Sequence, residues 1–259
     1  MTAAMTRVLK IGGRVQSDAA LAPTVAAAAR GGGIVVVHGG GDDISALQRQ
    51  LGHEPRFSGG RRVTSDAELD IVRMVLSGSA NKRLVAAFGA AGARAVGLSG
   101  EDGRLLRAHV APGAPLGRVG ERVSADPALL HDLLSTGWLP VVSPLARDAD
   151  DPGASGLNVN GDDAAAAIAA ALAAAELVFV ADVPGVLVDG AVVPTLGGDE
   201  ASSLITRGIA AGGMAAKIEA ALRALALGVS RVRITNLTSV NDPAGGTAFL
   251  SHSAAPWQQ

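Results

Sequence analysis

The sequence predicts an α/β fold in which a largely parallel sheet is covered by helices on both faces. Short runs rich in β-branched residues alternate with helical stretches along the chain, which is the pattern of βαβ units. The 259 residues can bury a sizeable core, and 48% of them are apolar. Aromatic residues make up only 2%, so the packing must rely on small side chains held close between helices and sheet.

Six short β-branched runs are predicted to be strands: Arg7–Ile11, Ile34–His38, Arg94–Leu98, Leu139–Ser143, Leu177–Ala181 and Arg231–Thr235. Ligands of parallel sheets bind at the carboxyl ends of the strands. Gly12–Gly13, Gly39–Gly41 and Asp182 fall at such ends, so we expect the functional site there.

The stretches between the strands have helical periodicity. They predict helices over Ala19–Arg30, Asp43–Gln50, Ala67–Gly78, Asn81–Ala91, Pro127–Ser135, Asp162–Ala175, Asp199–Arg207 and Ala215–Ala226. Segments rich in glycine, arginine and turn residues interrupt this alternation and are expected to form β-hairpins or lid loops over one rim of the sheet: Arg56–Thr64, Arg104–Val123, Arg147–Val159 and Val186–Val193. The change of composition near Ala175 predicts two lobes sharing one sheet, residues 1–175 and 176–259.

The composition argues against several classes of function. A formal charge of -2 provides no basic field for nucleic acid. The absence of cysteine excludes disulfides and thiolate metal sites and favours a reducing compartment, so we expect a cytoplasmic protein. The five histidines are scattered without zinc-site spacing, and no protein metal site is predicted. The longest apolar run, Ala164–Ala175, is well short of the ~20 residues that a membrane span requires.

Two lysines, Lys10 and Lys217, each stand beside glycines where one element is predicted to end or begin. Lys10 is followed by Ile11-Gly12-Gly13, and Lys217 ends Gly212-Gly213-Met214-Ala215-Ala216-Lys217. A transferring phosphoryl group needs an ammonium and bare backbone N–H groups at close range, because its charge must be neutralised there. The pair therefore indicates a small-molecule kinase.

A third glycine cluster, Gly39-Gly40-Gly41, leads from a predicted strand into a predicted helix. Its backbone N–H groups could bind an anion at the helix N-terminus, but a plain tight turn explains the glycines equally well. The segment fits neither GxGxxG nor GxxxxGK[ST], which removes the main support for a dinucleotide site or a P-loop.

Three further motifs have a functional and a structural interpretation each. Arg62, on a predicted hairpin, could bind a carboxylate through both arms of its guanidinium, or could simply be solvated. Asn158 and Asn160 would point the same way on an extended segment, whereas Asp162 could be a helix cap or a site residue. Asp182-Val183-Pro184-Gly185-Val186-Leu187 is a turn that could enclose a nucleotide.

In their order and spacing these motifs resemble the N-acetyl-L-glutamate kinases of the amino-acid kinase family. The resemblance extends from Val8 to Thr247 and includes Ala80-Asn81-Lys82 and Gly97-Leu98-Ser99-Gly100. It implies a three-layer αβα sandwich on a mainly parallel sheet of about eight strands. It also implies an ATP-dependent phosphorylation of N-acetyl-L-glutamate in arginine biosynthesis, by a homodimer formed through the N-terminal lobes. The amino acid would bind in lobe 1–175 and ATP in lobe 176–259.

The resemblance also assigns roles to individual residues. Lys10 and Lys217 would stabilise the transferring phosphoryl group, with Asp162 holding both ammonium groups and Gly13 and Gly40 adding N–H donors. The contacts to N-acetylglutamate would come from Gly40, Gly41, Arg62 and Asn158. The nucleotide would contact Gly12, Asp182, Val183, Pro184, Gly185, Val186, Leu187, Ile209, Ala210 and Ala211.

The chemistry fits these residue types. A carboxylate is already ionised at neutral pH, so no general base is needed to attack ATP. Bringing an anion to a polyanion needs positive charge at both ends of the displacement, which two ammonium groups and Mg²⁺ on the phosphates supply. We expect Mg²⁺ to be held mainly by phosphates and water.

Three alternatives remain open. A kinase of the same fold could act on carrier-protein-linked α-aminoadipate or glutamate, since Gly97-Leu98-Ser99-Gly100 occurs in both groups. A nicotinamide-dependent dehydrogenase shares the alternating pattern but needs GxGxxG, and a ligand sensor has no need for both lysines. Only Met1 to Leu9 precede Lys10, so we expect no arginine feedback through an extra N-terminal helix, and a dimer instead of a ring of dimers.

Overall fold

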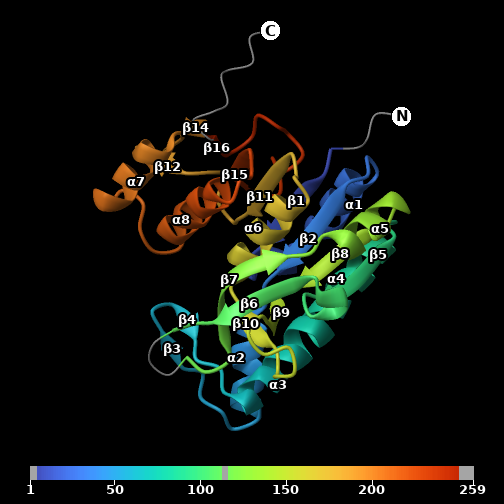
Figure 1. The fold of residues 1–259 in the computed structure, drawn as a ribbon. Helices are drawn as coiled ribbons and strands as arrows, with labels where there is room; N and C mark the ends of the chain where they lie inside the picture. Colours follow the sequence, from blue (N-terminus) through green and yellow to red (C-terminus); the bar gives the residue numbers. More distant parts are fainter. Residues whose placement is uncertain (1–4, 113–115, 251–259) are drawn as a thin grey trace.

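A computed structural model describes residues 5–112 and 116–250, and its centre is one eight-stranded sheet (Figure 1). The strands run in the order β14-β16-β15-β11-β1-β2-β8-β5. Their bounds are β1 Arg7–Ile11, β2 Ile34–His38, β5 Ala95–Ser99, β8 Leu139–Ser143, β11 Glu176–Val180, β14 Thr195–Leu196, β15 Arg231–Thr235 and β16 Thr247–Leu250. Every neighbouring pair is parallel except β15 with β16.

Helices cover both faces of this sheet because its strands are apolar on both sides. Along β1, Val8 faces one cluster of buried side chains while Leu9 and Ile11 face the other. The helices are α1 Leu21–Ala29, α2 Gly41–Gln50, α3 Asp66–Arg73, α4 Asn81–Ala90, α5 Ala128–Ser135, α6 Gly161–Ala171, α7 Gly198–Thr206 and α8 Gly212–Ala226. Helices α1 and α4 pack on the Leu9 face, whereas α5, α6 and α8 pack on the Val8 face. The predicted three-layer α/β sandwich is confirmed.

The strands of the sheet form two groups, one from each predicted lobe, which meet between β1 and β11. The strands β1, β2, β8 and β5 all precede residue 176, and β11, β15, β16 and β14 all follow residue 175. The two groups join through the parallel pairing of β1 with β11, so the sheet is continuous across the predicted lobe boundary. The outer ends of the two predicted lobes, residues 1–4 and 251–259, lie outside the described residues.

A closed four-stranded barrel packs beside this sheet, in front of it in Figure 1. Its strands are β6 Leu106–Val110, β7 Val119–Ala125, β9 Leu145–Asp148 and β10 Leu157–Val159. The hairpins expected over Arg104–Val123 and Arg147–Val159 are present as the antiparallel pairs β6–β7 and β9–β10, although residues 113–115 lie outside the described residues. Their closure on one another into a barrel was not predicted. Gly120 permits the closure: a Cβ there would lie 2.8–3.1 Å from side-chain atoms of Val159, Ala108 and Leu157.

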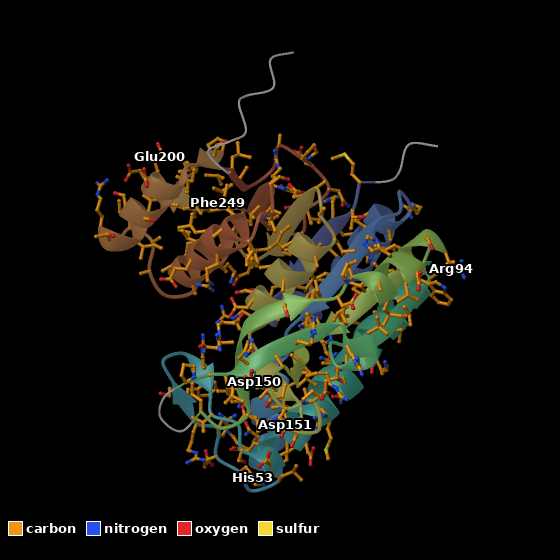
Figure 2. The ribbon with its side chains drawn as sticks, viewed as in Figure 1. His53, Arg94, Asp150, Asp151, Glu200 and Phe249 are labelled. Carbon is orange, nitrogen blue, oxygen red and sulfur yellow. The ribbon has the colours of Figure 1, made fainter. Side chains whose placement is uncertain are left out.

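Two small hairpins lie where Arg56–Thr64 and Val186–Val193 predict them. They consist of β3 Phe57–Ser58 with β4 Arg61–Arg62, and of β12 Leu187–Val188 with β13 Ala191–Val192. The β3–β4 hairpin adjoins the barrel and α2 in Figure 1. Figure 2 shows Asp150 and Asp151, from the β9–β10 connection, at the same end of the molecule.

Two predicted helices end earlier than their periodicity indicates. The stretch Ala67–Gly78 leaves α-helical geometry after Arg73 and continues as a π-helical segment, η2 Met74–Ala80, directly into α4. The stretch Asp162–Ala175 stops at Ala171, since Ala173 adopts a φ of 45° and the chain turns into β11. The second ending is accompanied by a hydrogen bond of 2.8 Å from the Ala175 N–H to the Thr6 carbonyl, a contact with a remote segment that a periodic pattern does not contain. In the described part of the chain, no helix combines the length and apolarity that a membrane crossing needs.

Candidate active site

A cavity of about 270 Å³ opens at the carboxyl ends of β1 and β2. Segments from across the N-terminal part of the chain line it, among them the end of β1, the glycine turn after β2, the β3–β4 hairpin, the start of β7, β10 and the start of α6. The residues that the sequence analysis expects to meet the amino acid all lie in its wall, together with two of the predicted catalytic residues: Gly40, Gly41, Arg62, Asn158, Lys10 and Asp162. Apolar side chains such as Ile44, Leu76 and Val159 complete the wall.

The Lys10 ammonium forms an ion pair with Asp162, with Nζ and Oδ1 2.7 Å apart. Lys10 shares the sheet face of Val8, which is the face that α6 covers, so its side chain meets the first turn of that helix. The two side chains are only 15% and 16% exposed, which strengthens their attraction relative to a solvated pair.

Asn160, and not Asp162, is the N-cap of α6. Its Oδ1 accepts a hydrogen bond of 2.7 Å from the Asp162 backbone N–H. The Asp162 carboxylate is therefore free for Lys10, which decides between the two interpretations left open for Asp162. Asn158 and Asn160 both line the first cavity, as expected for alternate residues of an extended segment.

Arg62 is buried and its guanidinium is held in one orientation. It donates to the Gly41 carbonyl at 2.9 Å, to Ser45 Oγ at 2.7 Å and to Gln48 Oε1. The Phe57 ring lies against it, with 4.7 Å between the guanidinium carbon and the ring centroid. Burial lowers the pKa of Arg62, and the Glu68 carboxylate opposes that effect. The solvated-arginine interpretation is wrong: this cation is fixed at the cavity wall.

The glycine turn after β2 is held by side chains that the sequence analysis did not single out. The Gly39 carbonyl accepts hydrogen bonds from Gln16 Nε2 and from His38 Nδ1, both at 2.8 Å. Because the C=O and N–H of a trans peptide point in opposite directions, this aims the Gly40 N–H away from both donors. In the described chain, neither the Gly40 N–H nor the Gly41 N–H has a hydrogen-bond acceptor.

Asn81 determines which tautomer His38 adopts. The Asn81 amide nitrogen donates to the Val141 carbonyl at 2.8 Å and lies 3.1 Å from His38 Nε2. Nε2 must therefore accept, which leaves the proton on Nδ1 for the Gly39 carbonyl. Burial of the imidazole lowers the pKa of His38 from 6.5 to about 4, so the ring is neutral at physiological pH. The motif Ala80-Asn81-Lys82 was the available signal for this role.

A second cavity of about 420 Å³ lies on the other side of the β1 end. It is lined by Gly12 and Gly13, by Asp182 and Val183 after β11, and by Gly213 and Lys217 from the first turns of α8. The strand end from Lys10 to Gly13 therefore separates two cavities, with one lysine at each. The sequence analysis expects Asp162 to hold both ammonium groups. In the structure it pairs with Lys10, and no ion pair of the described residues joins it to Lys217.

The remaining predicted nucleotide residues lie outside the wall of the second cavity: Pro184, Gly185, Val186, Leu187, Ile209, Ala210 and Ala211. Val186 and Ala210 are buried in the core, so their side chains do not face solvent. Leu187 and Ile209 are exposed by 42% and 41%. The Val186 N–H donates to Thr247 Oγ1 at 2.8 Å, which ties this segment to β16.

Comparison with known proteins identifies relatives of this chain. The family model described as "Amino acid kinase family" matches residues 5–236. An acetylglutamate kinase of Chloroflexus aurantiacus is 51% identical over 209 residues, covering 80% of this chain and 81% of that protein. An acetylglutamate kinase of Roseiflexus castenholzii is 47% identical over 236 residues, covering 90% of each.

A solved structure has the same fold. The crystal structure of smu.665 from Streptococcus mutans superposes with a TM-score of 0.80 at 26% identity, covering 95% of this chain and 98% of that one. The family match spans both cavities and all of the central sheet up to the end of β15. This chain is a member of the amino acid kinase family.

Proposed function

We propose that the protein is an acetylglutamate kinase, which transfers the γ-phosphoryl group of ATP to the side-chain carboxylate of N-acetyl-L-glutamate in arginine biosynthesis. Relatives with that name are 51% and 47% identical over most of the chain. The observation that carries the proposal is the pair of cavities on either side of the β1 end, each with a lysine in its wall.

The first cavity would take N-acetyl-L-glutamate. The fixed Arg62 cation provides positive charge that attracts a carboxylate, and Asn158 provides an amide that can both donate and accept. The N–H groups of Gly40 and Gly41, which have no acceptor among residues 5–112 and 116–250, provide donors for anionic oxygen. Apolar neighbours such as Leu76 and Val159 suit the methylene and methyl groups of the ligand.

The second cavity would take the phosphates of ATP, at the N-terminus of α8 and beside Gly12 and Gly13. We propose that the remaining nucleotide contacts come from the Asp182–Leu187 turn and the Ile209–Ala211 loop. Mg²⁺ would arrive on the phosphates and neutralise part of their charge.

In the reaction a carboxylate oxygen attacks the γ-phosphorus while the bond to the β–γ bridging oxygen breaks, and ADP leaves. Negative charge then lies on both sides of the transferring group. Lys10 would neutralise charge on the acceptor side and Lys217 on the donor side, with Gly13 adding an N–H donor. Asp162 would keep the Lys10 ammonium in place, since the two groups are paired at 2.7 Å.

We further propose that residues 1–175 bind the amino acid and form a homodimer, and that residues 176–259 bind ATP, in the cytoplasm. The first cavity is lined wholly by residues before 176, while the second adds Asp182, Gly213 and Lys217, which supports this division. Light scattering coupled to size-exclusion chromatography tests the dimer: a monomer at micromolar concentration contradicts it.

Hydroxylamine trapping tests the activity, because it converts an acyl phosphate into a stable hydroxamate. The substrates would be N-acetyl-L-glutamate, L-glutamate, N-acetyl-L-aspartate and the carrier-linked α-aminoadipate. We expect ATP-dependent hydroxamate with N-acetyl-L-glutamate well above the other three. Product from the carrier-linked substrate alone would assign the chain to the alternative kinase, and product from none would reject the proposal.

A further inference from the structure

We propose that Thr64 is a positioning residue, which sets the orientation of the Asn158 side-chain amide and thereby the binding of the amino-acid substrate. The part that concerns substrate binding rests on the proposed function. Thr64 lies between β4 and α3, is fully buried and does not line either cavity.

The Thr64 hydroxyl connects two residues of the first cavity. Its Oγ1 lies 3.0 Å from the Arg62 carbonyl oxygen and 3.1 Å from Asn158 Nδ2. A carbonyl only accepts, so the single hydroxyl proton belongs to the Arg62 carbonyl. Towards Asn158 the same oxygen must therefore accept, and the amide has to present its nitrogen.

This arrangement decides which atoms Asn158 offers to a ligand. One N–H is committed to Thr64, and Oδ1 receives no hydrogen bond from any residue of the described chain. The cavity therefore meets a free acceptor, Oδ1, and the second N–H of the amide. Such an acceptor suits an N–H donor on the ligand, as an acylated amino group provides.

Backbone hydrogen bonds hold the main chain of Thr64 in place beside that of Asn158. The Thr64 N–H donates to the Leu116 carbonyl at 2.9 Å, and the Arg118 N–H donates to the Thr64 carbonyl at 2.6 Å. The Asn158 N–H in turn donates to the Arg118 carbonyl at 2.9 Å. Thr64 and Asn158 are thus both fixed to the start of β7. Gly117 permits this contact, because a Cβ there would lie 2.3 Å from the Thr64 oxygen.

Removal of the hydroxyl alone isolates its role. Thr64→Val keeps the shape of the side chain but leaves Asn158 without its acceptor, so the amide is free to turn its nitrogen towards a ligand N–H. We expect the KM for N-acetyl-L-glutamate to rise by about tenfold, which is the worth of roughly one hydrogen bond. The KM for ATP and kcat should stay within about twofold, because the second cavity is untouched.

Conservative and distant variants control for a purely structural effect. Thr64→Ser keeps the hydroxyl, so its KM for N-acetyl-L-glutamate should stay near that of the unmodified protein. If Thr64→Val folds poorly, Thr64→Ala takes its place, since it also lacks the hydroxyl and should show the same rise in KM. Thr136→Val makes the same change on the exposed end of α5 and should leave both KM values unchanged. In an Asn158→Ala background, Thr64→Val should raise the KM no further.

Two results would overturn the proposal: an unchanged KM for N-acetyl-L-glutamate in Thr64→Val, or a full additional rise in the Asn158→Ala background. Failure of the proposed function is seen separately, as absence of turnover of N-acetyl-L-glutamate by the unmodified protein. In that case the side-chain amide resonance of Asn158 is the readout, assigned by its loss in Asn158→Ala. The positioning role is supported if the Asn158 resonance shifts in Thr64→Val but keeps its position in Thr64→Ser. It is rejected if the resonance has the same position in the unmodified protein, Thr64→Val and Thr64→Ser.

Discussion

The Lys10 ammonium lies 2.7 Å from the Asp162 carboxylate, although one residue belongs to the first strand and the other to the first turn of α6. This pairing holds the lysine in the wall of the first cavity, next to Gly12 and Gly13 in the wall of the second. It also compensates a cation that would otherwise face the positive end of a helix dipole. The site therefore depends on a contact between elements that are remote in the chain.

Removal of either site lysine should abolish most of the turnover. We expect Lys10→Ala and Lys217→Ala each to lower kcat by about two to three orders of magnitude, by analogy with the loss of one oxyanion donor. The KM for N-acetyl-L-glutamate should change far less in Lys10→Ala. Arg30→Ala is the control, since Arg30 is an exposed cation that lines neither cavity. Near-normal turnover in both site variants would reject the assigned roles.

Neutralising Asp162 should act mainly through Lys10. Asp162→Asn leaves the ammonium without its charged partner, so kcat should fall by about ten- to a hundredfold, the range expected when one or two charge-assisted hydrogen bonds are lost. Combined with Lys10→Ala, the second change should cost much less than it does alone, because both remove the same interaction. Steady-state kinetics of the two single variants and the double variant measure this coupling, and full additivity would contradict it.

The stability of the protein should fall on mild acidification because of His38. Its pKa is lowered to about 4 in the folded state, against 6.5 as the ordinary value. The unfolded state therefore binds a proton first as the pH falls, and stability is lost between about pH 6.5 and pH 4. The loss from this group is on the order of 3 kcal/mol, and it is complete below the folded pKa.

Urea unfolding at steps between pH 7 and pH 4 measures that loss. His38→Asn can still donate to the Gly39 carbonyl but does not titrate, so its unfolding free energy should fall less steeply over the same interval. Equal pH dependence of the two proteins would show that His38 contributes nothing to it.

Arg233 should matter for stability and not for substrate binding. It is 1% exposed and pairs with Glu176, which also pairs with Arg7 and Arg231. Arg233 further donates to backbone carbonyls of the β15–β16 connection. Arg233→Met should lower the free energy of unfolding by about 3–5 kcal/mol, because it breaks a buried ion cluster. The cluster lies at the strand ends opposite the cavities, so the KM values of the folded fraction should be unchanged. Calorimetry and steady-state kinetics test both parts.

Local patterns were sufficient for most of the fold. The segments Arg7–Ile11, Ile34–His38, Leu139–Ser143 and Arg231–Thr235 are strands with the predicted bounds, because buried parallel strands are short, β-branched and apolar on both faces. The helices were equally accessible from their periodicity. The barrel was not, because closure depends on which strands meet, and Gly120 reveals its role only beside Val159 and Ala108.

The candidate site also contains residues that the sequence predicts and residues that it does not. Lys10, Arg62, Asn158 and Asp162 could be named from motifs, since their residue types and the neighbouring glycines are those that phosphoryl and carboxylate chemistry needs. The residues that hold them could not. Thr64 and Gln16 act on partners from other elements, and nothing in their own neighbourhood in the chain marks them. The motif Ala80-Asn81-Lys82 marked Asn81 but did not reveal that its partner is His38.

The sequence by itself determined the order of strands and helices, the family and the chemical groups at the strand ends, because these depend on short stretches of chain and their spacing. Only the tertiary structure decided that Asn160 caps α6 so that Asp162 is free for Lys10, that Arg62 is buried, and that the end of β1 separates two cavities. These features come from packing and hydrogen bonds between remote segments, whose geometry exists only once the sheet has formed.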